Sequence, residues 1–272
     1  MDGVPEISSH ILIVGCGNMG GAMLRGWVAS GRSPKHFTVI DPVAQDLPSG
    51  VRHVASADAL DESFDTVLLG IKPQILDSLA PAIRARIAPN ALVLSILAGA
   101  MTSALAALFP DTHIVRLMPN LSAALGLSPL GLFSAALSSA ERDAVDALVA
   151  PLGTPVWIDD EAQMDAVTAL AGSGPAFVYR FIDALAQGGV AAGLPAETSA
   201  RLALATVAGA ARLAAVSDES PAALAMRVTS PGGTTAAGLA VLDAGDGLRN
   251  LVEATLKAAR DRGAQLAKGD KT

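Results

Sequence analysis

The stretch "HILIVGCGNMGGAMLRGWVASG", residues 10–31, decides the fold. It begins with an apolar β-type run, continues with "GCGNMG" and ends in a segment of helical character. In such a turn the first glycine, Gly15, allows a tight bend, and the second, Gly17, lets a pyrophosphate reach the backbone. The third, Gly20, lets helix and strand pack closely, and the helix amides face the anion. This order of strand, glycine turn and helix predicts a dinucleotide-binding unit.

The second β-type run, "FTVI", ends directly before Asp41, about 20 residues after the last glycine of the turn. An acidic residue at this place accepts hydrogen bonds from ribose hydroxyls, and its charge repels a 2′-phosphate. We expect NADPH or NADH as the cofactor. Of these two nucleotides, Asp41 favours NADH. Two alternatives stay open: Asp41 starts an ordinary "DP" turn, or Arg32 or Arg52 comes near a phosphate in the folded chain.

The first 160 residues alternate β-type runs with helical segments, which is typical of a doubly wound parallel sheet. We therefore predict an α/β fold with an N-terminal Rossmann domain over residues 1–160. The β-type runs cover residues 10–14, 37–40, 51–54, 66–71, 91–96, 113–118, 129–133 and 154–158.

After residue 158 the β-type runs stop, and we predict an all-α C-terminal dimerisation domain over residues 161–272. Its helices are rich in Ala and Gly, so each buries little apolar area, and we expect a partner chain to complete the core. A well-packed monomeric bundle is the alternative. The predicted helices cover about 161–171, 175–192, 196–216, 221–228, 234–244 and 247–268.

Composition narrows the class of protein. The 272 residues carry a formal net charge of −7 without a basic run, so nucleic acid is not an expected partner. The single cysteine, Cys16, allows no intrachain disulfide, and the four histidines have no metal-like spacing, so no metal site is predicted. The start "MDGVPEISSH" lacks the basic flank of a secretory signal, which favours the cytoplasm.

Two uncharged stretches, residues 87–110 and 117–140, have the length of a membrane span. The first changes from strand-like to helix-like character at Gly99, and the second contains Pro119, Asn120 and Pro129. Buried strands with connecting loops explain both stretches better, because fully covered parallel strands are continuously apolar. No membrane association is expected.

The second half of the chain offers little acid–base chemistry. No histidine follows His113, and the lysines beyond residue 160 are Lys257, Lys268 and Lys271. Oxidation of an alcohol needs a base for the hydroxyl proton, usually His or Lys. Reduction of a C=N bond relaxes this demand, because an iminium already carries the proton. Such an enzyme needs mainly orientation of the substrate and an anchor for the rest of it.

Two loops rich in glycine and hydroxyl groups interrupt the helical half. In "TSPGGTT", residues 229–235, backbone amides at a helix start can converge on a small carboxylate. An ordinary helix start capped by Ser or Thr is the alternative. The loop "TALAGSGPAF", residues 168–177, has the same chemistry. In the first half, "GIKPQ" (70–74) and "ILAGAM" (96–101) follow strands, at the edge where ligands of open α/β sheets bind.

The chain resembles the pyrroline-5-carboxylate reductase family from about Ile11 to Ala267. The likeness rests on "GCGNMGGAM", "GIKPQ", "SILAG", "RLMPN", "DAVTALAGSGPAF" and above all "VTSPGGTT". The resemblance implies a Rossmann domain, a helical domain whose helices interlock between two chains in a homodimer, and assembly of dimers into rings. It also implies reduction of 1-pyrroline-5-carboxylate to L-proline by NADPH or NADH, the last step of proline biosynthesis.

The resemblance also assigns site residues. Thr168 would be catalytic, close to the ring nitrogen of the substrate. The substrate carboxylate would be held by Ser230, Gly232, Gly233, Thr234 and Thr235. The cofactor would be bound by Gly15, Gly17, Asn18, Met19, Gly20, Asp41, Ile71, Lys72, Pro73, Ala98, Gly99 and Asn120.

Three positions depart from the usual pattern of this family. The segment after Asn120 lacks the Thr and Pro that usually follow it, and Phe177 replaces a common Tyr. Asp41 stands where relatives often carry residues that accept a 2′-phosphate. Two other functions remain open: a hydroxyacid or other imine oxidoreductase of the same two-domain shape, and a non-catalytic dinucleotide-binding sensor. Against the hydroxyacid enzyme, residues 175–192 contain no lysine.

Overall fold

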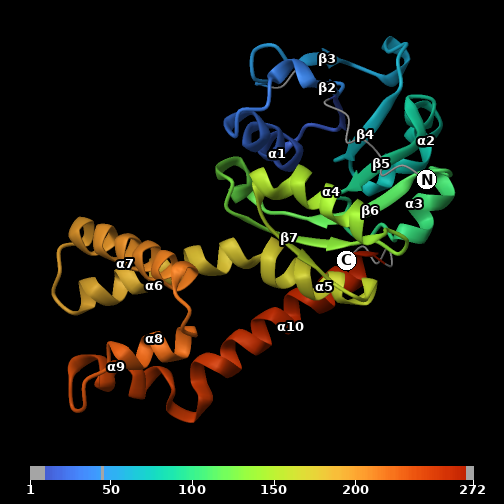
Figure 1. Ribbon diagram of the computed structural model, residues 1–272. Coiled ribbons are helices and arrows are strands. Elements are labelled where there is room, and N and C mark those ends of the chain that lie inside the picture. Colours follow the sequence, from blue (N-terminus) through green and yellow to red (C-terminus); the bar gives the residue numbers. More distant parts are fainter. Residues whose placement is uncertain (1–9, 44–45, 268–272) are drawn as a thin grey trace. The chain divides into compact units, whose positions relative to one another are not determined.

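The structure of the protein is a computed structural model that describes residues 10–43 and 46–267 (Figure 1). The chain divides into two compact units, Met1–Gly172 with Ala259–Thr272 and Ser173–Ala258, called the first and second unit below. Residues 1–9, on which the expectation about targeting rests, lie outside the described residues, as do Lys268 and Lys271. The predicted domain boundary at residue 160 stays a prediction.

The first unit is built on a sheet with the strand order β3-β2-β1-β4-β5-β6-β7-β8. The order reverses beside β1, as in doubly wound sheets, so the predicted Rossmann fold is confirmed. All neighbouring strands are parallel except β6 and β7. The strands are β1 (Ile11–Val14), β2 (Phe37–Ile40), β3 (Arg52–Val54), β4 (Phe64–Leu69), β5 (Ile87–Ser95), β6 (His113–Met118), β7 (Ser128–Phe133) and β8 (Gly153–Trp157).

The antiparallel pair departs from the predicted parallel sheet. Between β6 and β7 the chain forms only a short 3₁₀-helix, η4 (Leu121–Leu125). A parallel pair needs a crossover of about a dozen residues or more, usually containing a full helix, whereas a short connection returns the chain in the opposite direction. The length of this connection, which contains Asn120, therefore sets the direction of β7.

Apolar side chains cover both faces of the sheet. Ile11 and Ile13 of β1 belong to a core that includes side chains of α1 (Asn18–Ala29) and α4 (Ser139–Val149). Leu12 and Val14 belong to the opposite core, with side chains of α2 (Leu76–Arg84) and α3 (Thr102–Leu108). Burial on both faces explains why β1 is continuously apolar instead of alternating.

Close contact between backbones fixes α1 in place. A Cβ atom on Gly26 would lie 2.2 Å from the carbonyl oxygen of Ala123, so only glycine lets α1 pack against η4. The neighbouring Trp27 is fully buried, and its indole Nε1 donates to the carbonyl of Leu148 in α4 at 2.8 Å. These two contacts hold the helix that follows the glycine turn.

The sequence predicts one helix over about residues 161–171, but the structure divides residues 161–172 into three pieces. They are the 3₁₀-helix η6 (Glu161–Gln163), the helix α5 (Met164–Val167) and the π-helical turn η7 (Thr168–Gly172). A Cβ atom on Gly131 of β7 would lie 2.3 Å from Cγ1 of Val167, so this glycine lets α5 approach the sheet. π-Helical turns are rare and often occur at functional sites.

The second unit is helical, as predicted. It contains α6 (Gly174–Ala191), α7 (Ala196–Val216), α8 (Pro221–Arg227), α9 (Thr234–Leu242) and the start of α10 (Gly247–Ala267). Small residues join α6 to α7: a Cβ atom on Gly189 would lie 2.1 Å from Oγ of Ser199, which donates to the carbonyl of Ala186 at 2.6 Å.

Few side chains of the second unit are buried. In α6 to α9, which the structure describes throughout, only Ser199 and Ala203 are buried. Large apolar side chains remain exposed, among them Val216 and Val241. The helix α7 has the length and apolar composition of a membrane span. This is weak evidence for a membrane, because apolar core helices meet the same criteria. A unit with so small a core needs another apolar surface to cover it.

We predict that Gly26→Ala lowers the free energy of unfolding by about 1–3 kcal/mol, because its methyl group would collide with the backbone of η4. The control is Ala29→Ser, on the exposed side of the same helix, with an expected change within about 0.5 kcal/mol. Urea unfolding at one fixed protein concentration measures both. Equal stability of the two variants would show that the space between α1 and η4 accepts a methyl group at residue 26.

Candidate active site

The glycine turn lies between β1 and α1 and approaches the loop after β4. Gly15 has a φ of +88°, and a Cβ atom there would lie 2.7 Å from the carbonyl oxygen of Gly70. A Cβ atom on Gly20 would lie 2.5 Å from the carbonyl oxygen of Gly15. The fold itself therefore requires glycine at both positions.

Gly17 is different, because the fold gives no reason for a glycine there. Its φ of −67° suits any residue, and a Cβ atom would meet nothing within 4 Å. The free space over Gly17 fits a group that must come close to the backbone, as a pyrophosphate does. Gly17 also caps α1 without a side-chain hydrogen bond, so the first amides of the helix, at Asn18 and Met19, face a possible anion.

A cleft of about 590 Å³ opens at the carboxyl ends of β1, β2 and β4, where the strand order reverses. This is the position at which doubly wound sheets bind ligands. Five residues predicted to bind cofactor line the cleft: Gly15, Gly17, Asp41, Ile71 and Lys72. Pro73 follows directly and opens the 3₁₀-helix η3 (Pro73–Ile75).

Asp41 connects the end of β2 to the glycine turn. One carboxylate oxygen accepts from the amide of Cys16 at 2.9 Å, and the other accepts from the amide of Val43 at 3.0 Å. The carboxylate thus holds the turn in shape while it lines the cleft. Asp58 also lines the cleft, so two carboxylates border it. Lys72 adds one positive charge to the lining, but Asp41 at the end of β2 stands where a carboxylate disfavours a 2′-phosphate.

The only cysteine of the chain is buried in the glycine turn. Burial, and next the nearby Asp41 carboxylate, raise the pKa of the Cys16 thiol to about 11. The thiol is therefore protonated and weakly reactive near neutral pH, since the thiolate is the nucleophile. This agrees with a small packing residue rather than a redox centre.

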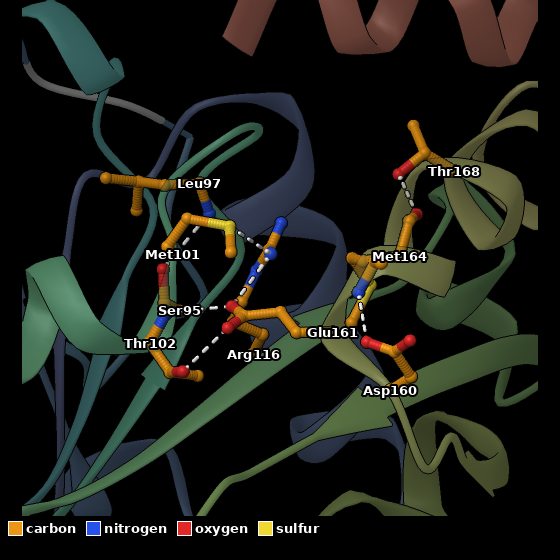
Figure 2. A network of polar contacts seen from close by, with 10 residues as sticks. Ser95, Leu97, Met101, Thr102, Arg116, Asp160, Glu161, Met164 and Thr168 are labelled. Carbon is orange, nitrogen blue, oxygen red and sulfur yellow. Dashed lines mark hydrogen bonds and ion pairs between the residues drawn. The ribbon is translucent and has the colours of Figure 1, made fainter.

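A buried ion pair supports the loop after β5, which carries Ala98 and Gly99 (Figure 2). Arg116 of β6 is 4% exposed, and its Nη1 lies 2.9 Å from Oε1 of Glu161. Glu161 also accepts from the amide and the hydroxyl of Thr102, both at 2.8 Å. One carboxylate thus joins β6, η6 and the start of α3, where the 96–101 loop ends.

Sequence reasoning missed this ion pair. The signal was Arg116 within the otherwise apolar run "HIVRLM", because a fully buried arginine needs a charged partner. The partner lies far along the chain, at Glu161, and nothing in the local pattern indicates it.

Thr168 opens the π-helical turn, and its hydroxyl donates to the carbonyl of Met164 at 2.8 Å (Figure 2). Because the hydroxyl proton is directed at this carbonyl, the Thr168 oxygen keeps its capacity to accept a hydrogen bond. Asn120 is buried directly after β6, and its side chain donates to the carbonyl of Ala171 in the same turn at 3.0 Å.

The "TSPGGTT" loop lies in the second unit, between α8 and α9. Gly232 has a φ of +71°, and Gly233 is the N-cap of α9 without a side-chain hydrogen bond. The helix therefore does not begin with the Ser or Thr cap of the alternative interpretation. The Gly233 amide donates to the carbonyl of Ser230 at 3.0 Å and so closes the turn before the helix. The first helical amides, at Thr234 and Thr235, have no intrahelical partner.

His10, His53 and His113 have structural contacts. His53 lies 2.8 Å from the carbonyl of Asp41, and His113 lies 3.1 Å from the Glu141 carboxylate. Within residues 10–43 and 46–267, no three His, Cys, Asp or Glu side chains gather in a metal-like group.

Comparisons with known proteins agree with this geometry. Residues 161–266 match the family model described as pyrroline-5-carboxylate reductase dimerisation, and residues 10–99 match NADP oxidoreductase, coenzyme F420-dependent. A pyrroline-5-carboxylate reductase of Pseudomonas aeruginosa is 37% identical over 95% of this chain and 97% of its own. One of Arabidopsis thaliana is 33% identical over 94% of this chain and 95% of its own.

Solved structures give the same result. The pyrroline-5-carboxylate reductase of Coxiella burnetii has a TM-score of 0.87 at 29% identity, over 97% of this chain and 99% of its own. The Plasmodium falciparum pyrroline carboxylate reductase, solved with NADP bound, has a TM-score of 0.81 at 27% identity, over 97% of this chain and 100% of its own.

A Rossmann sheet with a glycine turn at its ligand cleft, followed by a helical dimerisation domain, defines an NAD(P)H-dependent oxidoreductase. Relatives that match nearly the whole chain make the family specific. The chain belongs to the pyrroline-5-carboxylate reductase family, and the resemblance seen in the sequence is confirmed.

We predict that Glu161→Gln lowers the free energy of unfolding by about 3–5 kcal/mol, because it leaves the buried Arg116 charge without a counter-ion. The control is Glu219→Gln, which breaks a similar but exposed pair with Arg227 and costs about 1 kcal/mol or less. Urea unfolding compares the two variants. If Glu161→Gln lowers the free energy of unfolding no more than the control does, the buried pair stabilises the fold no more than an exposed pair.

Proposed function

We propose that the protein reduces 1-pyrroline-5-carboxylate to L-proline by hydride transfer from NADPH or NADH, the final step of proline biosynthesis. The observation that carries this proposal is the similarity to pyrroline-5-carboxylate reductases over nearly the whole chain. Three features suit this reaction. The glycine turn would bind the cofactor, the π-helical turn with Thr168 would orient the nitrogen, and the "TSPGGTT" loop would bind the carboxylate.

The substrate carboxylate binds at the start of α9. This helix begins at Gly233 without a side-chain cap, so the amides of Thr234 and Thr235 and the positive end of the helix dipole face outward. The hydroxyls of Ser230, Thr234 and Thr235 add donors for the same anion. Gly232, with its left-handed backbone, makes the bend that precedes the helix.

Thr168 orients the reacting nitrogen. Its oxygen can accept a hydrogen bond because its own proton goes to Met164, so it suits the N–H of a protonated imine. A nicotinamide bound in the cleft would supply the hydride to the carbon of C=N. The electron pair of that bond stays on nitrogen, which already carries its proton. The protein therefore contributes orientation rather than an acid.

The cleft at β1, β2 and β4 would hold the cofactor, with Gly17 leaving room for a pyrophosphate and Asp41 available to ribose hydroxyls. Ile71, Lys72 and Pro73 follow β4, and Ala98 and Gly99 follow β5, so both loops would contribute to cofactor binding. The two carboxylates that border the cleft favour NADH over NADPH.

A second copy of the chain covers the exposed apolar side chains of the second unit. The match to a dimerisation family over residues 161–266 supports this assembly. We propose a homodimer, assembled further into a ring, that works in the cytoplasm. Burial between copies accounts for the apolar helix α7 without a membrane.

The test of this function is the oxidation of NADH and of NADPH in the presence of racemic 1-pyrroline-5-carboxylate, followed by absorbance. We expect both to be oxidised, with a higher kcat/KM for NADH because of the charge near Asp41. The control is Gly15→Val, whose side chain would collide with Gly70 and close the turn. If neither nucleotide is oxidised, the proposed function is wrong and a dinucleotide-binding sensor is the alternative. Turnover of hydroxyacids instead would indicate a hydroxyacid oxidoreductase.

A second prediction tests the carboxylate site. A Cβ atom on Gly233 would lie 2.4 Å from Oγ of Ser230, so Gly233→Val displaces this hydroxyl and the helix start. We expect the KM for the substrate to rise roughly 10- to 100-fold, the value of a hydrogen bond to a charged group, while the KM for NADH stays unchanged. Gly238→Ala in the same helix, where a Cβ atom meets nothing within 4 Å, is the control. Equal increases in both KM values would count against a carboxylate at this loop.

A further inference from the structure

Near the end of the π-helical turn that carries Thr168, the carbonyl of Ala171 lacks its regular helical hydrogen bond. In a regular helix the carbonyl of Ala171 would accept from the amide of residue 175, but residue 175 is proline and has no N–H. The next amide along the chain, at Ala176, donates to Ser173 instead. A donor from elsewhere in the fold must therefore serve the Ala171 carbonyl.

Asn120 supplies this donor. Its Nδ2 lies 3.0 Å from the Ala171 carbonyl, which is 51 positions further along the chain. The opposite end of the amide is also fixed, because Oδ1 accepts from the amide of Ser122 at 2.9 Å and from the Ser122 hydroxyl. The backbone amide of Asn120 donates to Oγ of Ser128 at 2.9 Å. A primary amide carries its donor and its acceptor on separate atoms, so one end of Asn120 serves Ala171 while the other end serves Ser122.

These bonds occupy the side chain from both sides. Asn120 is 6% exposed, and its Oδ1, Nδ2 and main-chain N each have a partner in the protein. Such a residue has little capacity left for a cofactor. The sequence-based prediction that Asn120 binds the cofactor stays untested, but its contacts favour a different role.

We propose that Asn120 is a positioning residue, which holds the π-helical turn Thr168–Gly172 so that the Thr168 hydroxyl meets the nitrogen of the substrate. This inference rests on the proposed function for the role of Thr168. Met118 of the same strand lies beside the turn, since its sulfur would be 3.5 Å from a Cβ atom added to Gly172. The end of β6 thus lies beside the turn and holds it by one hydrogen bond.

The deciding variant is Asn120→Asp, which keeps the size and the acceptor for Ser122 but places a carboxylate oxygen against the Ala171 carbonyl. We expect kcat with 1-pyrroline-5-carboxylate to fall roughly 10- to 100-fold, since small misplacements of an orienting group have effects of this size. The KM for NADH should stay within about twofold, because the glycine turn is untouched. The control is Leu125→Ala in the neighbouring η4, whose exposed side chain makes none of these bonds, and we expect it to leave kcat unchanged.

A double-mutant cycle with Thr168→Val shows whether Asn120 acts through Thr168. We expect Asn120→Asp to cost little more once the hydroxyl is gone, because both changes remove the same function. Fully additive losses would overturn the inference. So would a raised KM for NADH or NADPH with an unchanged kcat, which is the result for a cofactor-binding residue.

Hydrogen exchange of the free protein gives a readout that does not depend on turnover. We expect Asn120→Asp, and also Asn120→Ser if the first variant folds poorly, to speed amide exchange around residues 168–176 and leave the α1 amides unchanged. Unchanged exchange in this segment would overturn the inference. If the wild type oxidises neither nucleotide, the proposed function fails, and the exchange result alone decides whether Asn120 holds the turn.

Discussion

The rest of the first unit depends on the close approach of two backbone segments, at Gly15 and Gly70. A Cβ atom on either residue would lie 2.7 Å from the carbonyl oxygen of the other, so neither position accepts a side chain. This contact joins the ends of β1 and β4, the two strands between which the sheet order reverses. It brings the glycine turn and the "GIKPQ" loop to one cleft and sets the space over Gly17.

The sequence indicated most of the sheet and of the helical half, because local pattern determines them. β1 is apolar throughout since both of its faces are buried, and the helices of the second unit are separated by Gly and Pro. Contacts between distant residues were not accessible in this way. The Arg116–Glu161 pair, the bonds of Asn120 and the division of 161–172 into three helical pieces all depend on partners that only the fold brings together.

The two units stabilise themselves by different means. The first unit has two apolar cores and satisfies its buried polar groups with specific bonds, such as those of Trp27 and Arg116. The second unit buries little and instead presents large apolar side chains. Its stability therefore belongs to the assembled protein more than to the single chain, as the match to a dimerisation family indicates. The carboxylate site proposed at the start of α9 lies in this unit.

The buried position of Cys16 affects how readily the protein is oxidised. A thiolate is oxidised when it attacks a peroxide or a disulfide, and a thiol with a pKa of about 11 forms almost no thiolate near neutral pH. The chain has no other cysteine, so its cofactor turn offers no point of attack for sulfenylation or glutathione adducts. Burial and the raised pKa of Cys16 thus leave the cofactor turn without a readily oxidised thiol.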